Sequence, residues 1–232
     1  MKLAISLGGS LLTGKTQEPN IQLNPHNYTR YAETIKKLHN QGHKIIVVCG
    51  GGKPARYLIQ TAKQLNASTT IQDNLGIKTT HINALLFTAA LGQAADQTRI
   101  YQRASDLKHA PPDKILVGAG YKPGSSTDYR AVIFAGAMQA DLIINATDID
   151  GVYTKNPKIH RDAEKLPTLT CLRLEEIIKE NTRQAPGEYG LFDLKAVRLA
   201  KKLGIPIAMI NGTDPEEIIR AVEGTHSGSI VR

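Results

Sequence analysis

The residues best suited to chemistry in this sequence surround a run of three glycines, Gly50 to Gly52. The run follows the apolar segment 45–48 and leads directly into a helical pattern that carries Lys53 and Arg56. Glycines leave the backbone N–H groups open to a ligand, and a helix N-terminus adds unpaired donors and a partial positive charge. This combination favours an anion, most often phosphate. A tight turn with two solvated cations is the alternative, but three consecutive glycines exceed what a turn needs.

Two further loops of this kind follow predicted strands. Gly8-Gly9-Ser10 closes a strand at 2–7, and the segment 118–128, GAGYKPGSSTD, follows a strand at 114–117. Both loops are rich in backbone N–H groups and hydroxyls, which donate hydrogen bonds to phosphate oxygens. A surface turn before a capped helix is the alternative for 118–128. A third strand–loop–helix unit of this type nevertheless favours a shared role in phosphate binding.

The chain alternates between strand and helix patterns over its whole length. Strands are expected at 2–7, 45–48, 114–117, 141–146, 205–210 and 229–231, with a short one near Ile100. Helices are expected from Pro25 to Gly42, at 53–66, 76–91, 129–139, 172–181 and 194–203, and from Asp214-Pro215 to Glu223. Thr127 or Asp128 is expected to cap the helix at 129–139, and Asp193 the helix at 194–203. A polar connection is expected at 159–167 and a mobile loop at 184–190. Such alternation predicts an α/β fold with a largely parallel sheet covered on both faces. Ligands of such sheets lie outside the carboxyl ends of the strands, where the glycine loops fall.

Several side chains are expected inside the protein rather than in a site. Leu65 and Leu85 belong to the apolar faces of predicted helices. His81 is interpreted as a core or interface histidine rather than a ligand. Cys49 and Cys171 stand alone in apolar contexts, which indicates core thiols in a reducing compartment.

Composition narrows the class of partner. The chain has 232 residues, 41% of them hydrophobic, and a net charge of +8. With 5% aromatic residues and no Trp, a base-stacking platform for nucleic acid is not expected, so the charge favours phosphorylated small molecules. No signal peptide and no segment of membrane-spanning length is recognised, and a cytoplasmic protein without a membrane partner is expected.

The chemistry that these loops favour is phosphoryl transfer. Donor-rich loops that converge on one sheet edge can hold two phosphorylated ligands end to end, and catalysis then consists mostly of positioning and charge stabilisation. A Walker A pattern and a dinucleotide-binding GxGxxG are both absent. No catalytic triad and no metal-ligand spacing is present, so any Mg²⁺ is expected to be held by the ligand phosphates and water.

Taken together, the loops resemble those of the amino acid kinase family, and within it the archaeal-type uridylate (UMP) kinases. The motifs that carry the resemblance are GGS at 8–10, GGGKPAR at 50–56, an Asp at 73, GYKPGSSTD at 120–128, ATDIDGVYTKNP at 146–157, FDLKAVRLAKKLGI at 192–205 and EGTHSGSIV at 223–231. The resemblance implies one domain over 1–232, folded as a three-layer αβα sandwich with a mostly parallel central sheet. It also implies a homohexamer that transfers the γ-phosphate of ATP to UMP.

The resemblance also implies roles for individual residues. The UMP contacts it implies are Gly51, Asp73, Gly120, Tyr121, Lys122, Pro123, Gly124, Ser125 and Ser126, with Asp73 at the ribose. The ATP contacts it implies are Gly9, Ser10, Gly52, Arg56, Thr147, Tyr153 and Asn156. Residues 1–140 would then form the acceptor half of the domain and residues 141–232 the ATP half.

The chain departs from the family pattern at two positions. Leu7 stands where many members carry a catalytic Lys in the first strand, so we expect Arg56 and Lys53 to supply the transition-state charge. Lys195 is a further candidate, because related kinases place a Lys near this position. Asn156 stands where members usually have Asp, which weakens the implied ATP contact or its base preference.

The sequence is also compatible with two other functions. Lys15 is similar to the phosphate-loop Lys of isopentenyl phosphate kinases, which share the fold, although their catalytic His soon after GGG is absent here. The acceptor could therefore be isopentenyl phosphate or another nucleotide. Leu7 and Asn156 are also compatible with a non-catalytic nucleotide-binding or storage protein.

Overall fold

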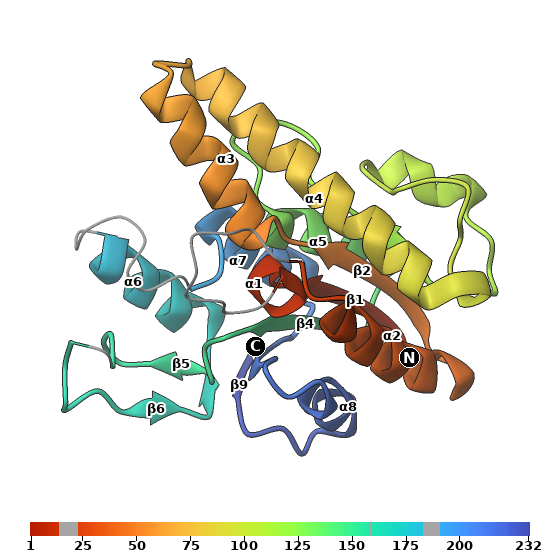
Figure 1. Ribbon diagram of the computed structural model, residues 1–232. Helices are drawn as coiled ribbons and strands as arrows, with labels where there is room; N and C mark the ends of the chain where they lie inside the picture. Colours follow the sequence, from red (N-terminus) through yellow and green to blue (C-terminus); the bar gives the residue numbers. More distant parts are fainter. Residues whose placement is uncertain (14–22, 158, 183–190) are drawn as a thin grey trace.

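The computed structural model describes residues 1–13, 23–157, 159–182 and 191–232, and is built on a seven-stranded sheet (Figure 1). The order across the sheet is β3-β2-β1-β4-β8-β9-β7. These strands are β1 (Lys2–Leu7), β2 (Lys44–Cys49), β3 (Leu116–Gly118), β4 (Leu142–Thr147), β7 (Thr168–Leu169), β8 (Ile207–Asn211) and β9 (Ser229–Val231). Only the β8–β9 pair is antiparallel among these neighbours. The predicted mostly parallel sheet is thus confirmed.

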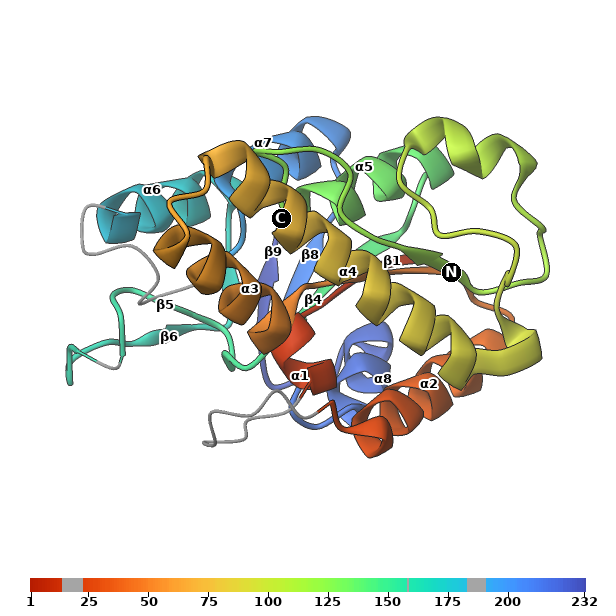
Figure 2. The same ribbon diagram turned by 45° about the horizontal axis from the view of Figure 1, so that its top comes forward.

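Helices cover both faces of this sheet (Figures 1 and 2). The helices are α1 (Gly9–Thr13), α2 (Pro25–Asn40), α3 (Gly52–Gln64), α4 (Thr69–Leu91), α5 (Thr127–Met138), α6 (Cys171–Thr182), α7 (Leu194–Leu203) and α8 (Glu216–Glu223), with short 3₁₀ turns at Gly92–Ala94 and Ala104–His109. One core contains residues of α2, α4 and α8, and the other residues of α5, α6 and α7. Along β1, Leu3 and Ile5 point into the first core and Ala4 into the second, as strand geometry requires. The three-layer αβα sandwich is confirmed.

Local capping explains where several helices begin. Asn24 accepts a hydrogen bond from the His26 N–H at 3.1 Å, and Asp193 accepts one from the Lys195 N–H at 2.7 Å, as the sequence predicts. The expectation for α5 is wrong, because Ser126 rather than Thr127 or Asp128 is the cap. The Asp128 side chain turns inward instead, where it accepts a hydrogen bond from a β1 serine.

The helix pair α3–α4 differs most from expectation. α4 begins at Thr69 rather than near residue 76, capped by Ser68, and lies side by side with α3 in both views (Figures 1 and 2). Leu65 and Leu85 are 75% and 58% exposed, so their predicted burial is wrong. Leu65 is the C-cap residue that follows α3, and Leu85 points away from the sheet because packing turns the other side of α4 inward.

Two short features of the chain were predicted incompletely. The strand expected near Ile100 is a single bridge between Tyr101 and Gly118. The polar connection at 159–167 contains β6 (Lys165–Leu166), which pairs with β5 (Val152–Tyr153) as a two-stranded hairpin. Strands of two residues are too short to leave a recognisable alternation.

The remaining expectations on buried and loop residues have mixed outcomes. Cys49 and Cys171 are both buried free thiols, as predicted. Among the described residues, no helix combines the length and apolar character that crossing a membrane requires. Lys15 and the expected mobile loop at 184–190 lie outside the described residues.

Candidate active site

The glycine loops meet at the carboxyl edge of the sheet, because β1, β2, β3 and β4 are parallel neighbours. The Gly8 N–H donates to the Ala146 carbonyl at 2.9 Å, which joins the first loop to the end of β4. The first and second loops pack backbone against backbone. A Cβ atom on Gly9 would lie 2.2 Å from the Gly52 nitrogen, and one on Gly50 would lie 2.6 Å from the Gly9 nitrogen. Only glycine allows this approach.

A cavity of about 340 Å³ opens beside the paired glycine loops. It is lined by Gly51, Gly52, Ala55, Arg56, Ile59, Asp73, Gly76, Ile77, Thr80, Gly120, Lys122, Pro123, Gly124, Ser125, Ser126 and Thr127. Eight of the nine residues that the resemblance assigns to the acceptor are in this set, from the α3 start, α4 and the acceptor loop, as we call residues 120–126. Tyr121 is the exception and lies outside the lining. We call this cavity the acceptor cavity.

The contribution of α4 to this cavity was not expected from the sequence. Gly76, Ile77 and Thr80 line it together with the predicted Asp73, and Ala55, Ile59 and Thr127 complete the wall. Residues 73, 76, 77 and 80 recur at helical spacing, so they share one face once α4 is known to begin at Thr69. This spacing could have identified the shared face from the sequence. The helix was expected to begin at residue 76, however, which left Asp73 outside it.

Helix α4 also holds both loops by hydrogen bonds. Thr80 Oγ1 accepts from the Gly120 N–H at 2.9 Å, and His81 Nε2 contacts the Gly120 carbonyl at 2.8 Å. Asn83 Nδ2 donates to the carbonyls of Gly50 and Gly51 at 2.7 and 3.1 Å. The contact of His81 is structural, in agreement with its interpretation as a core or interface residue. Asn83 was not singled out by the sequence, although an amide in an apolar helix is a signal.

We expect Asn83→Leu to weaken both the fold and ligand binding. Asn83 is fully buried and its Oδ1 also accepts from Tyr28 Oη at 3.0 Å, so the change leaves three buried groups without their partner. Each unsatisfied group costs about 1–3 kcal/mol. Urea unfolding should show a loss of several kcal/mol, and both nucleotide KM values should rise.

Thr88→Val is the control for this prediction. Thr88 lies further along α4, is buried, and bonds only to the Ala84 carbonyl one turn earlier, so its replacement should change stability by about 1 kcal/mol or less. If Asn83→Leu were no more destabilising than Thr88→Val, the role of Asn83 as a loop anchor would be contradicted.

Three of the residues assigned to ATP by resemblance lie along the same edge. Gly9 and Ser10 begin α1 directly after β1, and Thr147 ends β4, the strand next to β1. Tyr153 lies on β5, where its hydroxyl donates to Asp150 at 2.9 Å. Asn156 is only 2% exposed. The acceptor cavity is lined by two of the seven residues assigned to ATP, Gly52 and Arg56, and by none of the other five.

Two of the three candidate catalytic cations reach the acceptor cavity or its loop. Arg56 lines the cavity, and Lys195 Nζ donates to the Gly124 carbonyl at 3.4 Å from the first turn of α7. Lys53 lies in the first turn of α3 and is not among the lining residues. Leu7, at the position of the family Lys, is buried in the core. Of the three candidates, Arg56 and Lys195 are therefore the two that the fold brings to the cavity or its loop.

Comparison with known proteins decides the family. The sequence profile of the amino acid kinase family matches residues 1–211. The chain belongs to the amino acid kinase family. A uridylate kinase of Methanobrevibacter smithii is 35% identical over 231 residues, covering 100% of this chain and 99% of the relative. A uridylate kinase of Archaeoglobus fulgidus is 34% identical over 232 residues, covering 100% of both chains.

Solved structures agree with this assignment. The crystal structure of uridylate kinase from Archaeoglobus fulgidus superposes with a TM-score of 0.84 at 32% identity, covering 100% of both chains. An aspartate kinase from Synechocystis gives a TM-score of 0.71 at 20% identity, covering 91% of this chain and 38% of that one, which shows the fold alone. The sheet and its flanking helices are thus those of an amino acid kinase.

A partly buried carboxyl group follows the acceptor loop of this amino acid kinase by two residues. Asp128 Oδ1 accepts from Ser6 Oγ at 2.7 Å. Burial raises the pKa of Asp128 to about 6, the hydrogen bond from Ser6 opposes the rise, and the charge of Asp193 adds to it. Asp128 is thus a functional candidate, although the sequence suggested only a helix cap at this position.

The raised pKa of Asp128 predicts how stability changes with pH. In the unfolded chain this carboxyl titrates near 3.8, so its contribution to folding is fully present below that pH and is lost as pH rises through about 6. Asp128→Asn should flatten the pH profile of unfolding free energy between pH 4 and 7 by up to about 3 kcal/mol.

The titration of Asp128 is best measured by ¹³C NMR of labelled aspartate carboxyls. Ser6→Ala should raise the pKa of Asp128 further, because it removes a hydrogen bond that favours the charged form. A carboxyl that titrates near pH 4 in the wild type would contradict the prediction.

Divalent metal would enter this site with a nucleotide. Within the part of the chain that the structure describes, no three His, Cys, Asp or Glu side chains are grouped to hold a metal ion. The donors at the paired glycine loops are N–H groups and hydroxyls, which suit phosphate oxygens rather than a cation. Such a donor set fits a Mg²⁺ ion held through nucleotide phosphates and water.

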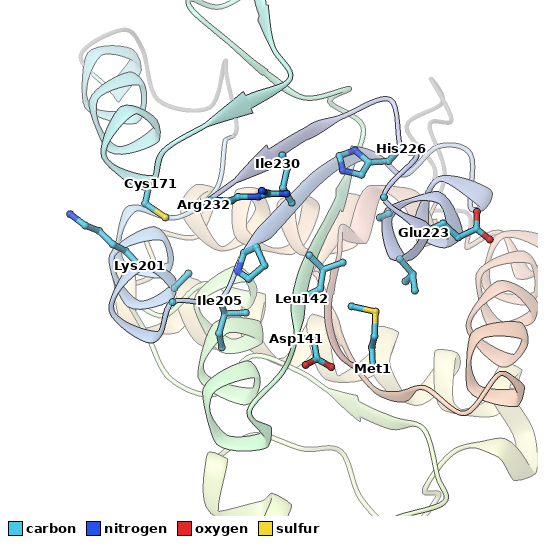
Figure 3. A pocket seen from close by; sticks show the side chains of 16 residues that line it. Met1, Asp141, Leu142, Cys171, Lys201, Ile205, Glu223, His226, Ile230 and Arg232 are labelled. Carbon is cyan, nitrogen blue, oxygen red and sulfur yellow. The ribbon is translucent and has the colours of Figure 1, made fainter.

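A second, larger cavity lies at the opposite edge of the sheet (Figure 3). Its volume is about 570 Å³, and residues that precede or begin β1, β4 and β8 line it, among them Met1, Asp141 and Pro206. None of the residues predicted for the site lies there. Because ligands of parallel sheets bind at the carboxyl edge, the acceptor cavity rather than this one is the candidate active site.

Proposed function

We propose that this chain is a nucleoside monophosphate kinase that transfers the γ-phosphate of ATP to UMP, giving UDP and ADP. The observation that carries the proposal is the acceptor cavity, which joins Asp73, the acceptor loop and Arg56 beside two glycine loops in backbone contact. Its relatives of similar length are named uridylate kinases, which supports UMP as the acceptor. One domain, 1–232, contains both nucleotide sites.

The acceptor nucleotide occupies the acceptor cavity in this proposal. The Asp73 carboxylate accepts hydrogen bonds from the ribose hydroxyls. The acceptor loop wraps the base and the α-phosphate with the backbone and hydroxyl groups of its residues, Gly120, Tyr121, Lys122, Pro123, Gly124, Ser125 and Ser126. Gly51 contributes a backbone group to the same nucleotide. Every lining residue falls within 51–127, which supports the assignment of residues 1–140 to the acceptor.

The donor nucleotide binds along the adjacent edge. Backbone N–H groups of Gly9 and Gly52, the Ser10 hydroxyl and Arg56 contact the ATP phosphates. Thr147, Tyr153 and Asn156, in the 141–232 half, contact the nucleoside, with Asn156 changing the base preference relative to an Asp. The packing of the first glycine loop against the second supports this placement, because it sets both loops next to Arg56.

Phosphoryl transfer then depends on alignment and charge. The α-phosphate oxygen of UMP attacks the γ-phosphorus of ATP in line, and the bond from that phosphorus to the bridging oxygen of ADP breaks. Arg56, Lys53 and Lys195 stabilise the negative charge on the moving group. Mg²⁺ bound with ATP would neutralise further phosphate charge.

A coupled assay of ADP release tests this function. UMP, CMP, dTMP and isopentenyl phosphate are supplied separately with Mg-ATP, and we expect UMP to give the highest kcat/KM. A strong preference for isopentenyl phosphate or for another nucleotide would replace UMP as the acceptor. Tight ATP binding without UDP formation at any Mg²⁺ concentration would instead identify a non-catalytic binder.

We also propose a homohexamer in the cytoplasm. Exposed apolar side chains on α3 and α4, at Leu65, Ile71, Ile82 and Leu85, support burial of this helix pair against another copy of the chain. Sedimentation analysis should give a mass of several chains, and a single species of 25.2 kDa would contradict the assembly.

A further inference from the structure

Arg130, in the first turn of α5, is buried behind the acceptor loop. It is 4% exposed, and its Nε is one of the few buried polar side-chain atoms without a hydrogen-bond partner in the described residues. Among the described residues, no carboxylate forms an ion pair with it, whereas Arg198 and Arg220 both have one. Burial lowers the pKa of Arg130, because removing the charged guanidinium from water costs free energy. Arginine side chains are almost never fully buried unless they are paired, so the burial of Arg130 calls for a structural explanation.

The guanidinium of Arg130 contacts both ends of one loop segment. Nη2 donates to Ser125 Oγ at 3.2 Å, and Cζ lies 5.1 Å from the centre of the Tyr121 ring. Ser125 lines the acceptor cavity, whereas Tyr121 lies outside it. One side chain on a rigid helix therefore holds the segment 121–125 at two points, four residues apart.

We propose that Arg130 is a positioning residue that fixes the acceptor loop over the acceptor nucleotide. This inference rests on the proposed function, because it assigns the acceptor loop to the UMP site. Lys122, Pro123 and Gly124, between the two contact points, line the cavity, so their placement depends on where Tyr121 and Ser125 are held. The residue acts on acceptor binding through the loop and does not itself line the cavity.

The chemistry of the two contacts requires arginine. A planar guanidinium stacks on an aromatic ring and donates a directed hydrogen bond at the same time. Lysine keeps the charge but not the planar, directed donors, and glutamine keeps a donor but loses the charge and the stacking. We therefore expect Arg130→Lys to be impaired and Arg130→Gln to be impaired further.

Steady-state kinetics with UMP and ATP varied separately test the proposal. A hydrogen bond to a charged group contributes about 1.5–3 kcal/mol, so we expect KM for UMP to rise about tenfold or more in Arg130→Gln. KM for ATP should stay within about twofold, because the donor loops do not contact Arg130. Calorimetry with UMP alone, in which no turnover occurs, should show a matching rise in the Kd for UMP.

A matched control is provided by Arg103. Its Cζ lies 5.7 Å from the same ring, but its side chain is 62% exposed and is near Asp106. Arg103→Gln should change KM for UMP by no more than about two- to fivefold, because a solvated cation near a ring contributes about 0.5–1 kcal/mol. An equal effect of Arg103→Gln and Arg130→Gln would overturn the proposal.

Ser125→Ala combined with Arg130→Gln separates positioning from a general effect on the fold. If Arg130 acts through Ser125, the double variant should lose less UMP affinity than the two single losses multiplied. Arg130→Lys, which keeps the buried charge but not the planar donors, keeps the test available if Arg130→Gln does not fold. Additive losses, or equal rises of both KM values, would overturn the inference.

The same measurements distinguish this inference from the proposed function. If the wild type prefers another acceptor, the UMP assignment fails, and Arg130→Gln should still raise the KM of that acceptor selectively. If the wild type turns over UMP and Arg130→Gln leaves its KM for UMP unchanged, the positioning role fails while the function stands.

Discussion

Gly9→Ala is expected to lower kcat/KM by about 10²-fold or more. The added Cβ would lie 2.2 Å from the Gly52 nitrogen and 2.6 Å from the Gly50 carbonyl oxygen, both of them backbone atoms that no rotamer change can move. The first and second glycine loops must therefore separate. A displacement of about 1 Å in a positioning group can itself cost about 10²-fold in rate.

Kinetics on folded protein measure this effect, with far-UV circular dichroism to establish that the variant retains its helices and strands. Gly52→Ala should behave similarly, because Gly52 has φ +64 and its added Cβ would lie 2.5 Å from the Gly9 carbonyl oxygen. Activity close to wild type in both variants would show that contact between the two loops is not required.

Gly42→Ala is the control for an alanine at a glycine. Gly42 has φ +87, and nothing lies within 4 Å of an added Cβ, so the change strains the backbone without displacing a neighbour. We expect it to lose about 1–2 kcal/mol of stability and to keep its kcat/KM.

Lys195→Met is expected to lower kcat by about 10²–10³-fold with a smaller change in the KM values. Lys195 Nζ lies 3.4 Å from the Gly124 carbonyl at the acceptor loop, and Leu7 cannot supply charge from the first strand. Methionine keeps most of the length of the side chain and removes its charge, so the loss reports charge stabilisation of the transferred group.

Single-turnover measurement of UDP formation checks this prediction without interference from product release. Lys202→Met, near the far end of the same helix and exposed, should leave kcat unchanged. Full turnover by Lys195→Met would remove Lys195 from the mechanism and leave Arg56 as the principal cation of the cavity.

Much of the fold could be predicted because it depends on short-range preferences. β1 has the predicted bounds Lys2–Leu7, and α7 has the predicted bounds Leu194–Leu203. Asn24 and Asp193 cap their helices through residues two positions later, so these starts can be recognised in a short segment of sequence. The acceptor side of the site was also predictable in part, because Gly51, Asp73 and most of the acceptor loop belong to recognisable motifs.

The errors occur where packing between distant segments decides the outcome. Leu85 was expected inside, but the packing of α4 against α2 and the sheet directs Asn83 and Phe87 inward instead. The contribution of Thr80 to the acceptor cavity depends on a bond to Gly120, forty positions away. Such a contact leaves no periodic pattern in either segment.

The sequence by itself determined the order of the longer strands and helices and the loops in which glycines expose the backbone. These features follow from local conformational preference and from apolar periodicity, which each segment carries alone. Only the tertiary structure decided that α4 holds two loops at once and that Arg130 is buried behind the acceptor loop. Burial and side-chain direction depend on which elements pack together, and that choice is made by the whole chain rather than by any one segment.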